Sequence, residues 1–291
     1  MEQSEAHGAT AGESKPALYV VATPIGNLRD VTLRALEVLK TVALVAAEDT
    51  RVTARLLDHY QIATPLAALH AHNEKSAIPR MLRILATGRS MALVSDAGTP
   101  AISDPGAQLV AAARAAGYRV VPVPGASALT TAMSAAGFSA PQFLFYGFLP
   151  QRAAERRRAL EALRTVPYPL VFYEAPHRIA AALADLGGVL GIGRRIVIAR
   201  ELTKLFETIH ACTLGEAPLW IASDAHRSRG EFVLIVEGAA DEGVKVEQAQ
   251  RVLELLLEEL PLKHAVALAA RITGAKKNEL YALALQLKGE Q

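Results

Sequence analysis

The chain has 291 residues, of which 51% are apolar and 21% are charged, and its formal net charge is +2 at pH 7. This length exceeds the usual size of a single domain, so we expect two compact domains and a small appendage. Charged residues interrupt every apolar stretch before the roughly 18 residues that a membrane span needs, and a single cysteine excludes an internal disulfide, so we expect a cytoplasmic protein without a metal site.

The first part of the chain alternates between two kinds of apolar pattern. Residues 1–16 are small and polar, and we predict a disordered leader there. The predicted strands that follow are 18–22, 42–47, 66–69, 91–95 and 119–123, and the predicted helices lie at 33–39, 50–59, 78–87 and 106–116. Asp30 is predicted to cap the first of these helices. The alternation predicts a parallel sheet covered by helices, in an N-terminal α/β domain over residues 17–124.

A second α/β domain is predicted over residues 125–240. Its predicted strands are 143–147, 170–173, 195–199, 208–212 and 232–237. Because the strand at 208–212 follows the preceding strand without an intervening helix, we expect a mixed sheet. Residues 241–291 show helical spacing and no strand, which predicts a helical appendage. Its middle helix ends at Gly274, and this layout fits either a helix-turn-helix-like module or packing between subunits.

Three loops rich in small residues follow predicted strands, at 21–28, 95–106 and 122–127. The first contains Gly26 but lacks the Gly-x-Gly-x-x-Gly pattern of a phosphate cradle, so we do not expect pyrophosphate there. Small residues let a ligand approach the backbone closely, and the amides at a helix start can receive anionic groups. These loops predict a ligand-binding cleft at the carboxyl edge of the sheet.

Six short motifs occur in order along the chain: TPIGNL at 23–28, AEDTR at 47–51, SDAGTP at 95–100, VPGAS at 123–127, FYEAPHR at 172–178 and ARELTK at 199–204. This succession resembles the small-subunit ribosomal RNA methyltransferase I family of the tetrapyrrole methylase superfamily, from about residue 18 to the end. The resemblance implies a two-domain α/β homodimer that binds S-adenosylmethionine between its domains. It also implies methylation of the 2′-hydroxyl of a cytidine near the decoding site of small-subunit (16S) ribosomal RNA, in the 30S particle.

The resemblance also implies a set of cofactor contacts. The matching positions are Ile25, Ala97, Gly98, Thr99, Ile102, Ser127, Ala128, Glu174 and Leu202, to which we add the neighbours Asp96 and Gly230. Corrin-type relatives carry a glycine-rich first loop where this chain has Ala22 and Pro24. These relatives also carry Gly-Gly-Asp where this chain has Ala-Gly-Thr at residues 97–99. These departures weaken the case for a tetrapyrrole substrate.

Candidate catalytic residues follow from the chemistry of a ribose hydroxyl, which is too weak an acid to ionise at neutral pH. A base can therefore help only by accepting the proton as the methyl bond forms. The candidates are Glu48, Asp49, Glu174, His177 and Arg200. Helix capping is the alternative for Glu48 and Asp49, an exposed helix start for His177, and salt bridging for Arg200.

Basic residues gather in two segments and within the last two of the six motifs, which indicates contact with RNA phosphates. The candidates are Arg156, Arg157, Arg158, Arg178, Lys204, Lys276 and Lys277. The alternative to RNA contact is that these residues lie on solvated helix faces or form internal salt bridges. Two other functions stay open: a tetrapyrrole or corrin carbon methyltransferase on the same scaffold, and a non-catalytic, cofactor-sensing ribosome-binding protein.

Overall fold

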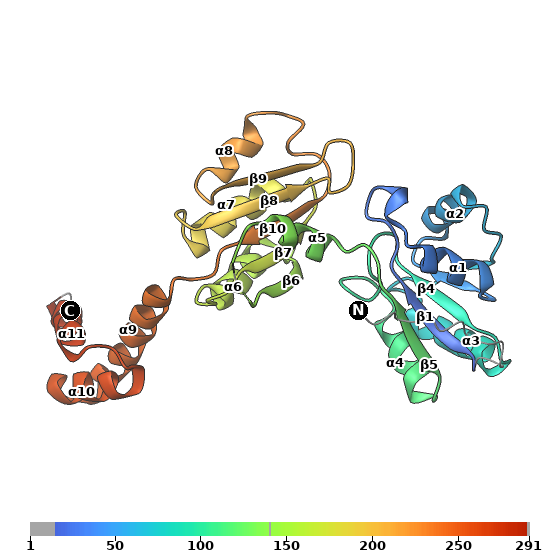
Figure 1. The fold of residues 1–291 in the computed structure, drawn as a ribbon. Coiled ribbons are helices and arrows are strands. Elements are labelled where there is room, and N and C mark those ends of the chain that lie inside the picture. The colour runs from blue at the N-terminus through green and yellow to red at the C-terminus, as the bar shows by residue number, and fades with distance from the viewer. Residues whose placement is uncertain (1–14, 140, 290–291) are drawn as a thin grey trace, which may run out of the picture. The chain divides into compact units, whose positions relative to one another are not determined.

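The computed structural model describes residues 15–139 and 141–289, so all but the last two residues of the predicted leader lie outside the described part. By its contacts the chain divides into two compact units (Figure 1). The first unit comprises the residues up to Thr131 together with Glu201–Glu207, and the second comprises Ala132–Arg200 and the residues from Thr208. The predicted folding domains 17–124, 125–240 and 241–291 stay a prediction.

The first unit is built on a five-stranded sheet. Its strands are β1 (Ala17–Val21), β2 (Val45–Ala47), β3 (Leu66–Ala68), β4 (Met91–Val94) and β5 (Arg119–Val123), in the order β3-β2-β4-β1-β5. All neighbouring pairs are parallel, which confirms the predicted parallel sheet. Every residue of the central strand β4 is buried, as expected for a strand with both faces covered.

Four α-helices and a short 3₁₀ helix accompany this sheet: η1 (Leu28–Asp30), α1 (Leu33–Thr41), α2 (Thr50–His59), α3 (Glu74–Ala86) and α4 (Ala107–Ala115). The cap of α1 is Thr32, whose hydroxyl accepts a hydrogen bond from the amide of Ala35 at 3.1 Å. The prediction of Asp30 as this cap is wrong, because Asp30 belongs to η1. Strand β2 begins three residues later than predicted, because the amide of Val42 still bonds to the end of α1.

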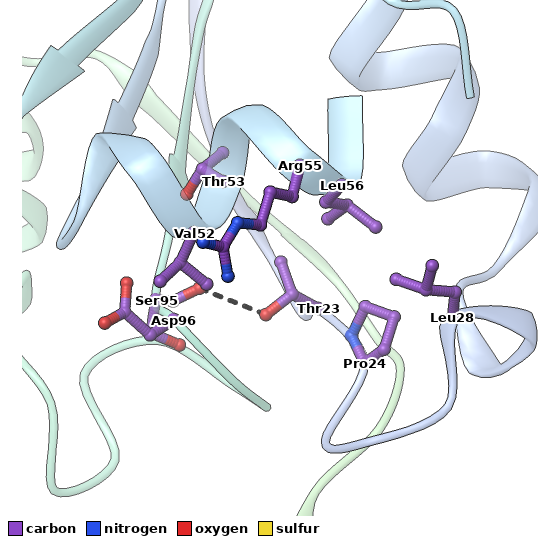
Figure 2. A pocket seen from close by; sticks show the side chains of 9 residues that line it. All are labelled: Thr23, Pro24, Leu28, Val52, Thr53, Arg55, Leu56, Ser95 and Asp96. Carbon is purple, nitrogen blue, oxygen red and sulfur yellow. Dashed lines mark hydrogen bonds between the residues drawn. The ribbon is translucent and has the colours of Figure 1, made fainter. Parts of the chain in front are cut away.

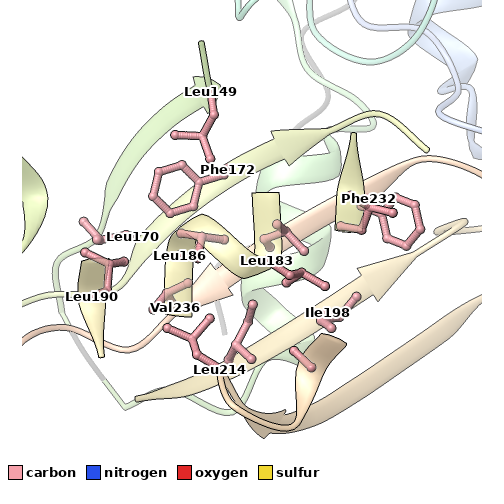
Figure 3. Close-up of a cluster of buried hydrophobic side chains, with 14 of the residues drawn as sticks. Leu149, Leu170, Phe172, Leu183, Leu186, Leu190, Ile198, Leu214, Phe232 and Val236 are labelled. Atoms are coloured by element: carbon pink, nitrogen blue, oxygen red, sulfur yellow. The ribbon is translucent and has the colours of Figure 1, made fainter. Parts of the chain in front are cut away.

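The second unit contains a mixed five-stranded sheet. Its strands are β6 (Leu144–Phe148), β7 (Leu170–Glu174), β8 (Arg195–Arg200), β9 (Thr208–Thr213) and β10 (Phe232–Val236), in the order β6-β7-β10-β8-β9. Only the β6–β7 pair is parallel, which confirms the predicted mixed sheet. The helices before and between them are α5 (Ala128–Ala135), α6 (Ala153–Leu163), α7 (Ile179–Leu190) and α8 (Ala217–Ala222). Leu183 and Leu186 of α7 pack with Phe172 and Leu234 in the core (Figure 3).

The C-terminal segment forms three helices, α9 (Asp241–Glu259), α10 (Leu262–Thr273) and α11 (Lys277–Gly289). Leu253, Val266 and Leu280, one from each helix, are buried in a small core of their own. Gly274 ends α10 in the left-handed conformation at φ 72°, which confirms the predicted helix end. Among the described residues, none of the helices is both long and apolar enough for a membrane crossing.

Candidate active site

Three loops meet at the carboxyl edge of the first sheet, where open α/β sheets bind ligands. Thr23, after β1, and Gly98, after β4, exchange two backbone hydrogen bonds of 2.8 and 3.0 Å. The hydroxyl of Thr99 donates to the carbonyl of Ala126, after β5, at 3.2 Å. The predicted loops 21–28, 95–106 and 122–127 are therefore held together as one surface.

The loop after β4 has an unusual backbone. Gly98 and Gly106 adopt φ values of +81° and +122°, and the non-glycine residues Ala101 and Ser103 both adopt φ 65°. A left-handed conformation costs a non-glycine residue about 1–2 kcal/mol, and such residues concentrate at functional sites. Between them, Ile102 keeps 43% of its surface exposed. The loop thus presents an apolar side chain on a backbone that the surrounding bonds hold in place.

Three amides at the start of α4 are already bonded inside the first unit, so they are not free for a ligand as the sequence-based expectation for this loop would have them. The buried carboxylate of Glu74, on α3, accepts hydrogen bonds from the amides of Gly106, Gln108 and Leu109 at 3.0, 2.9 and 3.2 Å. These are the amides that a helix start leaves without partners. Sequence reasoning missed Glu74, because nothing local marks an acceptor that is more than 30 residues from its donors.

The segment Glu201–Glu207 packs on the first unit through Gly26. A Cβ atom at Gly26 would collide with Cγ of Lys204 and lie 3.0 Å from the carbonyl oxygen of Leu202. A glycine is therefore needed at position 26 because Leu202 and Lys204 approach its backbone closely, and not because its φ is positive. Leu202 is buried, and the ammonium group of Lys204 forms an ion pair of 2.9 Å with Glu201. Lys204 thus forms an internal ion pair, and its predicted contact with RNA stays a prediction.

Asp49, a predicted catalytic residue, serves as the cap of α2. Its carboxylate accepts the amide of Arg51 at 2.8 Å and forms an ion pair with the guanidinium of Arg51 at 2.6 Å. The hydrogen bonds from Arg51 lower the pKa of Asp49 to about 2. A carboxylate with so low a pKa is a poor proton acceptor at neutral pH, so the capping alternative describes Asp49 better than the catalytic one.

Glu48 lies in a more suitable environment for a base. Its Oε2 accepts the amide of Asp96 at 3.5 Å, and Oδ1 of Asp96 in turn accepts the amide of Asp49 at 2.9 Å. Burial, followed by the charge of Asp96, raises the pKa of Glu48. Asp104, which sequence reasoning missed, has a pKa of about 6 because of burial and the charges of Glu48 and Asp96. Carboxylates with raised pKa values are typical of proton acceptors in active sites.

Replacing Asp104 with asparagine is expected to stabilise the fold at neutral pH. The folded-state pKa of about 6 lies above the ordinary 3.8, so ionised Asp104 destabilises the fold, increasingly from pH 3.8 to 6 and fully above that range. The free energy of unfolding of Asp104→Asn should rise by about 1 kcal/mol near pH 7, with allowance for partial exposure, and by almost nothing near pH 4. Urea unfolding at both pH values measures this. An equal gain for Glu37→Gln, on the exposed side of α1, would contradict it.

A cavity of about 290 Å³ opens beside these carboxylates, between the loop after β1 and helix α2 (Figure 2). Its lining residues are Thr23, Pro24, Leu28, Val52, Thr53, Arg55, Leu56, Ser95 and Asp96. Thr23 donates a hydrogen bond of 3.1 Å to the carbonyl of Ser95, which joins the two loops at its floor. Of the predicted cofactor contacts, only Asp96 lines this cavity.

In the second unit, Glu174 ends β7 and is almost entirely buried. Its Oε1 accepts the amide of Ala175 at 2.8 Å and lies 3.1 Å from Nε of Arg178. Burial raises the pKa of Glu174, and within the described residues its Oε2 has no hydrogen-bond partner. Arg178 also donates to the carbonyls of Leu149 and Pro150, so most of its donors are used inside the unit. His177 is exposed just before α7, as its alternative interpretation has it.

Two arginines predicted to act on RNA or substrate are buried and bonded inside the second unit. Arg156 is 4% exposed, pairs with Asp185 at 2.6 Å and donates to the carbonyl of Gln151 at 3.1 Å. Its predicted contact with RNA therefore does not hold, because its guanidinium is buried. Arg200 is 8% exposed and donates to the carbonyls of Arg229 and His226 at 2.6 and 2.7 Å. These bonds tie Arg200 to the loop before β10, which agrees with its alternative as an internally bonded residue, and its catalytic role stays a prediction.

The other predicted residues differ in exposure. Arg158 is exposed, and Arg157 is half exposed although it lies 3.2 Å from Asp185. Asp96 and Ala97 are exposed at the loop after β4, and the remaining cofactor candidates Ile25, Thr99, Ser127, Ala128 and Gly230 are partly or fully buried. In the part of the chain that the structure describes, no group of three or more His, Cys, Asp or Glu side chains is arranged to hold a metal ion.

Comparison with known proteins gives two family matches. The family model described as Tetrapyrrole (Corrin/Porphyrin) Methylases matches residues 17–218. The model described as RsmI C-terminal HTH domain matches residues 244–288, which cover most of α9, α10 and α11. Together these matches include both sheets, except strand β10, and the helical segment.

Among curated proteins, the chain is similar to two bacterial relatives named Ribosomal RNA small subunit methyltransferase I. It is 56% identical to that of Pseudomonas aeruginosa, over 95% of this chain and 99% of the relative. It is 52% identical to that of Escherichia coli O157:H7, over 96% and 98%. Both relatives are matched over almost their whole length.

Among solved structures, the fold is similar to those of two tetrapyrrole-modifying enzymes. One is the cobalt precorrin-4 methyltransferase CbiF, with a TM-score of 0.59 and 16% identity over 79% of this chain and 98% of that one. The other is uroporphyrin-III C-methyltransferase from Thermus thermophilus, solved with S-adenosyl homocysteine, with a TM-score of 0.54 and 18% identity over 76% and 97%. At these identities the likeness concerns the fold alone.

Proposed function

This chain belongs to the tetrapyrrole methylase family, in its ribosomal RNA small subunit methyltransferase I group, and from that premise we propose that it methylates a cytidine 2′-hydroxyl near the decoding site of 16S ribosomal RNA. The enzyme is a methyltransferase that uses S-adenosylmethionine. The observation that carries the choice of substrate is 56% identity over 99% of a relative named for small-subunit ribosomal RNA. The proposal includes a cytoplasmic homodimer that acts on the 30S particle.

The loop after β4 fits a methyl donor. A Cβ atom at Gly98 would lie 3.4 Å from Cγ2 of Ile25 and 3.8 Å from the carbonyl of Ala126, so this glycine lies next to both neighbouring loops. Its missing side chain leaves room for a ligand close to the backbone. S-adenosylmethionine supplies an activated methyl group on its sulfonium. The residues that would hold it are Gly98 and Thr99, which hydrogen bonds hold in place, and the exposed Ile102.

The chain's remaining task is to orient the ribose and to accept its proton. We assign proton acceptance to Glu48, because it is partly buried and adjoins Asp96 at the cavity. Its raised pKa brings the carboxylate closer to the operating pH, which strengthens a general base. Asp104 adds negative charge that favours uptake of the proton by this group of carboxylates.

The experiment that tests this proposal uses labelled S-adenosylmethionine with three acceptors in parallel: 30S particles, free 16S ribosomal RNA and a tetrapyrrole precursor. We expect label in the RNA of the particles, because a presented single-stranded nucleotide is the form that proteins read best in RNA. Label in the tetrapyrrole alone would favour the corrin-type alternative. Cofactor binding without transfer to any acceptor would favour the cofactor-sensing ribosome-binding protein.

The helical segment is proposed to bind RNA through the turn between α10 and α11. Lys276 and Lys277 are exposed there, and the surface pair of Lys276 with Glu279 at 3.2 Å is weak. For Lys276→Ala/Lys277→Ala, each lost phosphate contact should make the slope of log affinity against log salt shallower by about 0.7 to 0.9, with cofactor affinity unchanged. Filter binding at several salt concentrations measures this. The paired control is Lys40→Ala/Lys75→Ala, and a salt slope identical to the parent's would mean that the turn serves subunit packing.

A further inference from the structure

The cavity beside α2 has two chemically different ends. Figure 2 shows Leu28, Pro24 and Leu56 together at one end, with Ser95 and Asp96 at the other. Val52 and Arg55 extend from successive turns of α2, and the guanidinium of Arg55 reaches toward the polar end. The cavity therefore suits a ligand that has one flat apolar part and one polar, charged part.

Arg55 is the positively charged residue that lines this cavity. Within the described part of the chain, Arg55 makes no hydrogen bond or ion pair, and it is exposed. Arg51, one turn earlier on α2, is bound to the carboxylate of Asp49 instead. A guanidinium at the mouth of a partly apolar cavity is well placed to bind a phosphate in a bidentate manner.

The volume of the cavity limits the size of the anionic ligand that can bind there. At about 290 Å³ it is at the lower end of the range for small-molecule sites. A single extruded nucleotide is of this scale, whereas a tetrapyrrole macrocycle is not. S-adenosylmethionine carries both a cationic sulfonium and an anionic carboxylate, so the affinity measurements described below, and not charge, distinguish it from a nucleotide in this cavity.

Relying on the methyl transfer proposed above, we propose that this cavity is the subsite for the target nucleotide of the RNA. The base lies against Pro24, Leu28 and Leu56, and Arg55 binds an adjoining phosphate. The ribose then lies at the end formed by Asp96, next to the loop where the methyl donor is expected. Asp96 thus belongs to both subsites, which is what transfer from donor to acceptor requires.

The test compares Arg55→Gln with Arg80→Gln, which removes the same charge from an exposed position of α3 outside the cavity. For Arg55→Gln we expect the KM for 30S particles to rise about tenfold or more, as for loss of a charge-assisted contact. The salt slope of RNA binding should become shallower by about 0.7 to 0.9. The Kd for S-adenosylmethionine, measured by calorimetry, should match the parent's, and Arg80→Gln should match the parent in all three measurements.

A second variant tests the apolar wall independently of charge. Val52→Phe adds bulk on a side chain that is 38% exposed and lines the cavity, so the fold should tolerate it. It should raise the KM for the particles without changing the salt slope or the affinity for S-adenosylmethionine. Melting temperatures of both variants confirm that they are folded.

Three outcomes separate the possible failures. If the parent transfers no methyl group to ribosomal RNA, the proposed function fails, and this subsite fails with it. If the parent is active but Arg55→Gln and Val52→Phe behave like Arg80→Gln, only the subsite is wrong. If the affinity for S-adenosylmethionine falls together with the RNA affinity, the cavity belongs to the methyl donor, and the assignment to the nucleotide is overturned.

Discussion

A Gly98→Val protein is expected to bind S-adenosylmethionine about 100-fold more weakly than the parent, because two costs add at this position. Gly98 has φ +81°, a conformation that a β-branched residue adopts only with strain of about 1–2 kcal/mol. A Cβ atom there would already be in van der Waals contact with Cγ2 of Ile25 at 3.4 Å, so the two further methyl groups of valine would crowd that residue. Both effects move the loop that is proposed to approach the methyl donor.

The matched control for this change is Gly88→Val. Gly88 has φ +80°, but a Cβ atom there would meet no atom within 4 Å. It therefore carries the same backbone strain without the steric contact, and should lose stability but keep its affinity for S-adenosylmethionine. The positive φ of Gly98 also predicts a loss of stability in Gly98→Val, which the control measures. Unchanged affinity in folded Gly98→Val would remove the loop from the site.

Replacing Glu48 with glutamine is expected to lower kcat for methylation of 30S particles by about 100-fold, the lower range for loss of a general base. The amide keeps the shape of the side chain and can still accept a hydrogen bond from the amide of Asp96, but it cannot take a proton. The affinity for S-adenosylmethionine should therefore stay unchanged, and single-turnover kinetics with saturating cofactor measures the chemical step.

The dependence of this rate on pH adds a readout that a merely structural role would not change. Because burial and Asp96 raise the pKa of Glu48, the parent's rate should fall as the pH drops through that raised pKa, where Glu48 becomes protonated. The rate of Glu48→Gln should lack this titration. Glu37→Gln, which removes a carboxylate from the exposed face of α1, should retain the parental profile. A Glu48→Gln enzyme with the parent's rate would assign the proton to another acceptor.

The sequence predicted those features that depend on local pattern. The bounds of α2 were predicted correctly, because Asp49 supplies a cap before the helix and apolar residues recur along it. The parallel and mixed sheets followed from the presence or absence of helices between strands. The end of α10 followed from Gly274, which adopts the left-handed conformation that favours glycine.

The features that sequence reasoning missed depend on contacts between distant segments. Glu74 caps α4 from another helix, and Asp104 acquires its raised pKa from Glu48 and Asp96 only after folding. The basic run of α6 predicts that Arg156 faces RNA together with Arg157 and Arg158, yet Arg156 shares a helix face with the buried Leu160 and Leu163. That spacing was visible in the sequence and could have identified the buried arginine.

The measurement that tests the central claim most directly identifies the atom that receives the methyl group. 16S ribosomal RNA is recovered from 30S particles after incubation with the enzyme and labelled S-adenosylmethionine, and is digested with a nuclease that needs a free 2′-hydroxyl. The account predicts a single labelled, nuclease-resistant dinucleotide whose methylated residue is a cytidine near the decoding site. Label that is released entirely as mononucleotides would place the methyl group on a base, and would contradict the account.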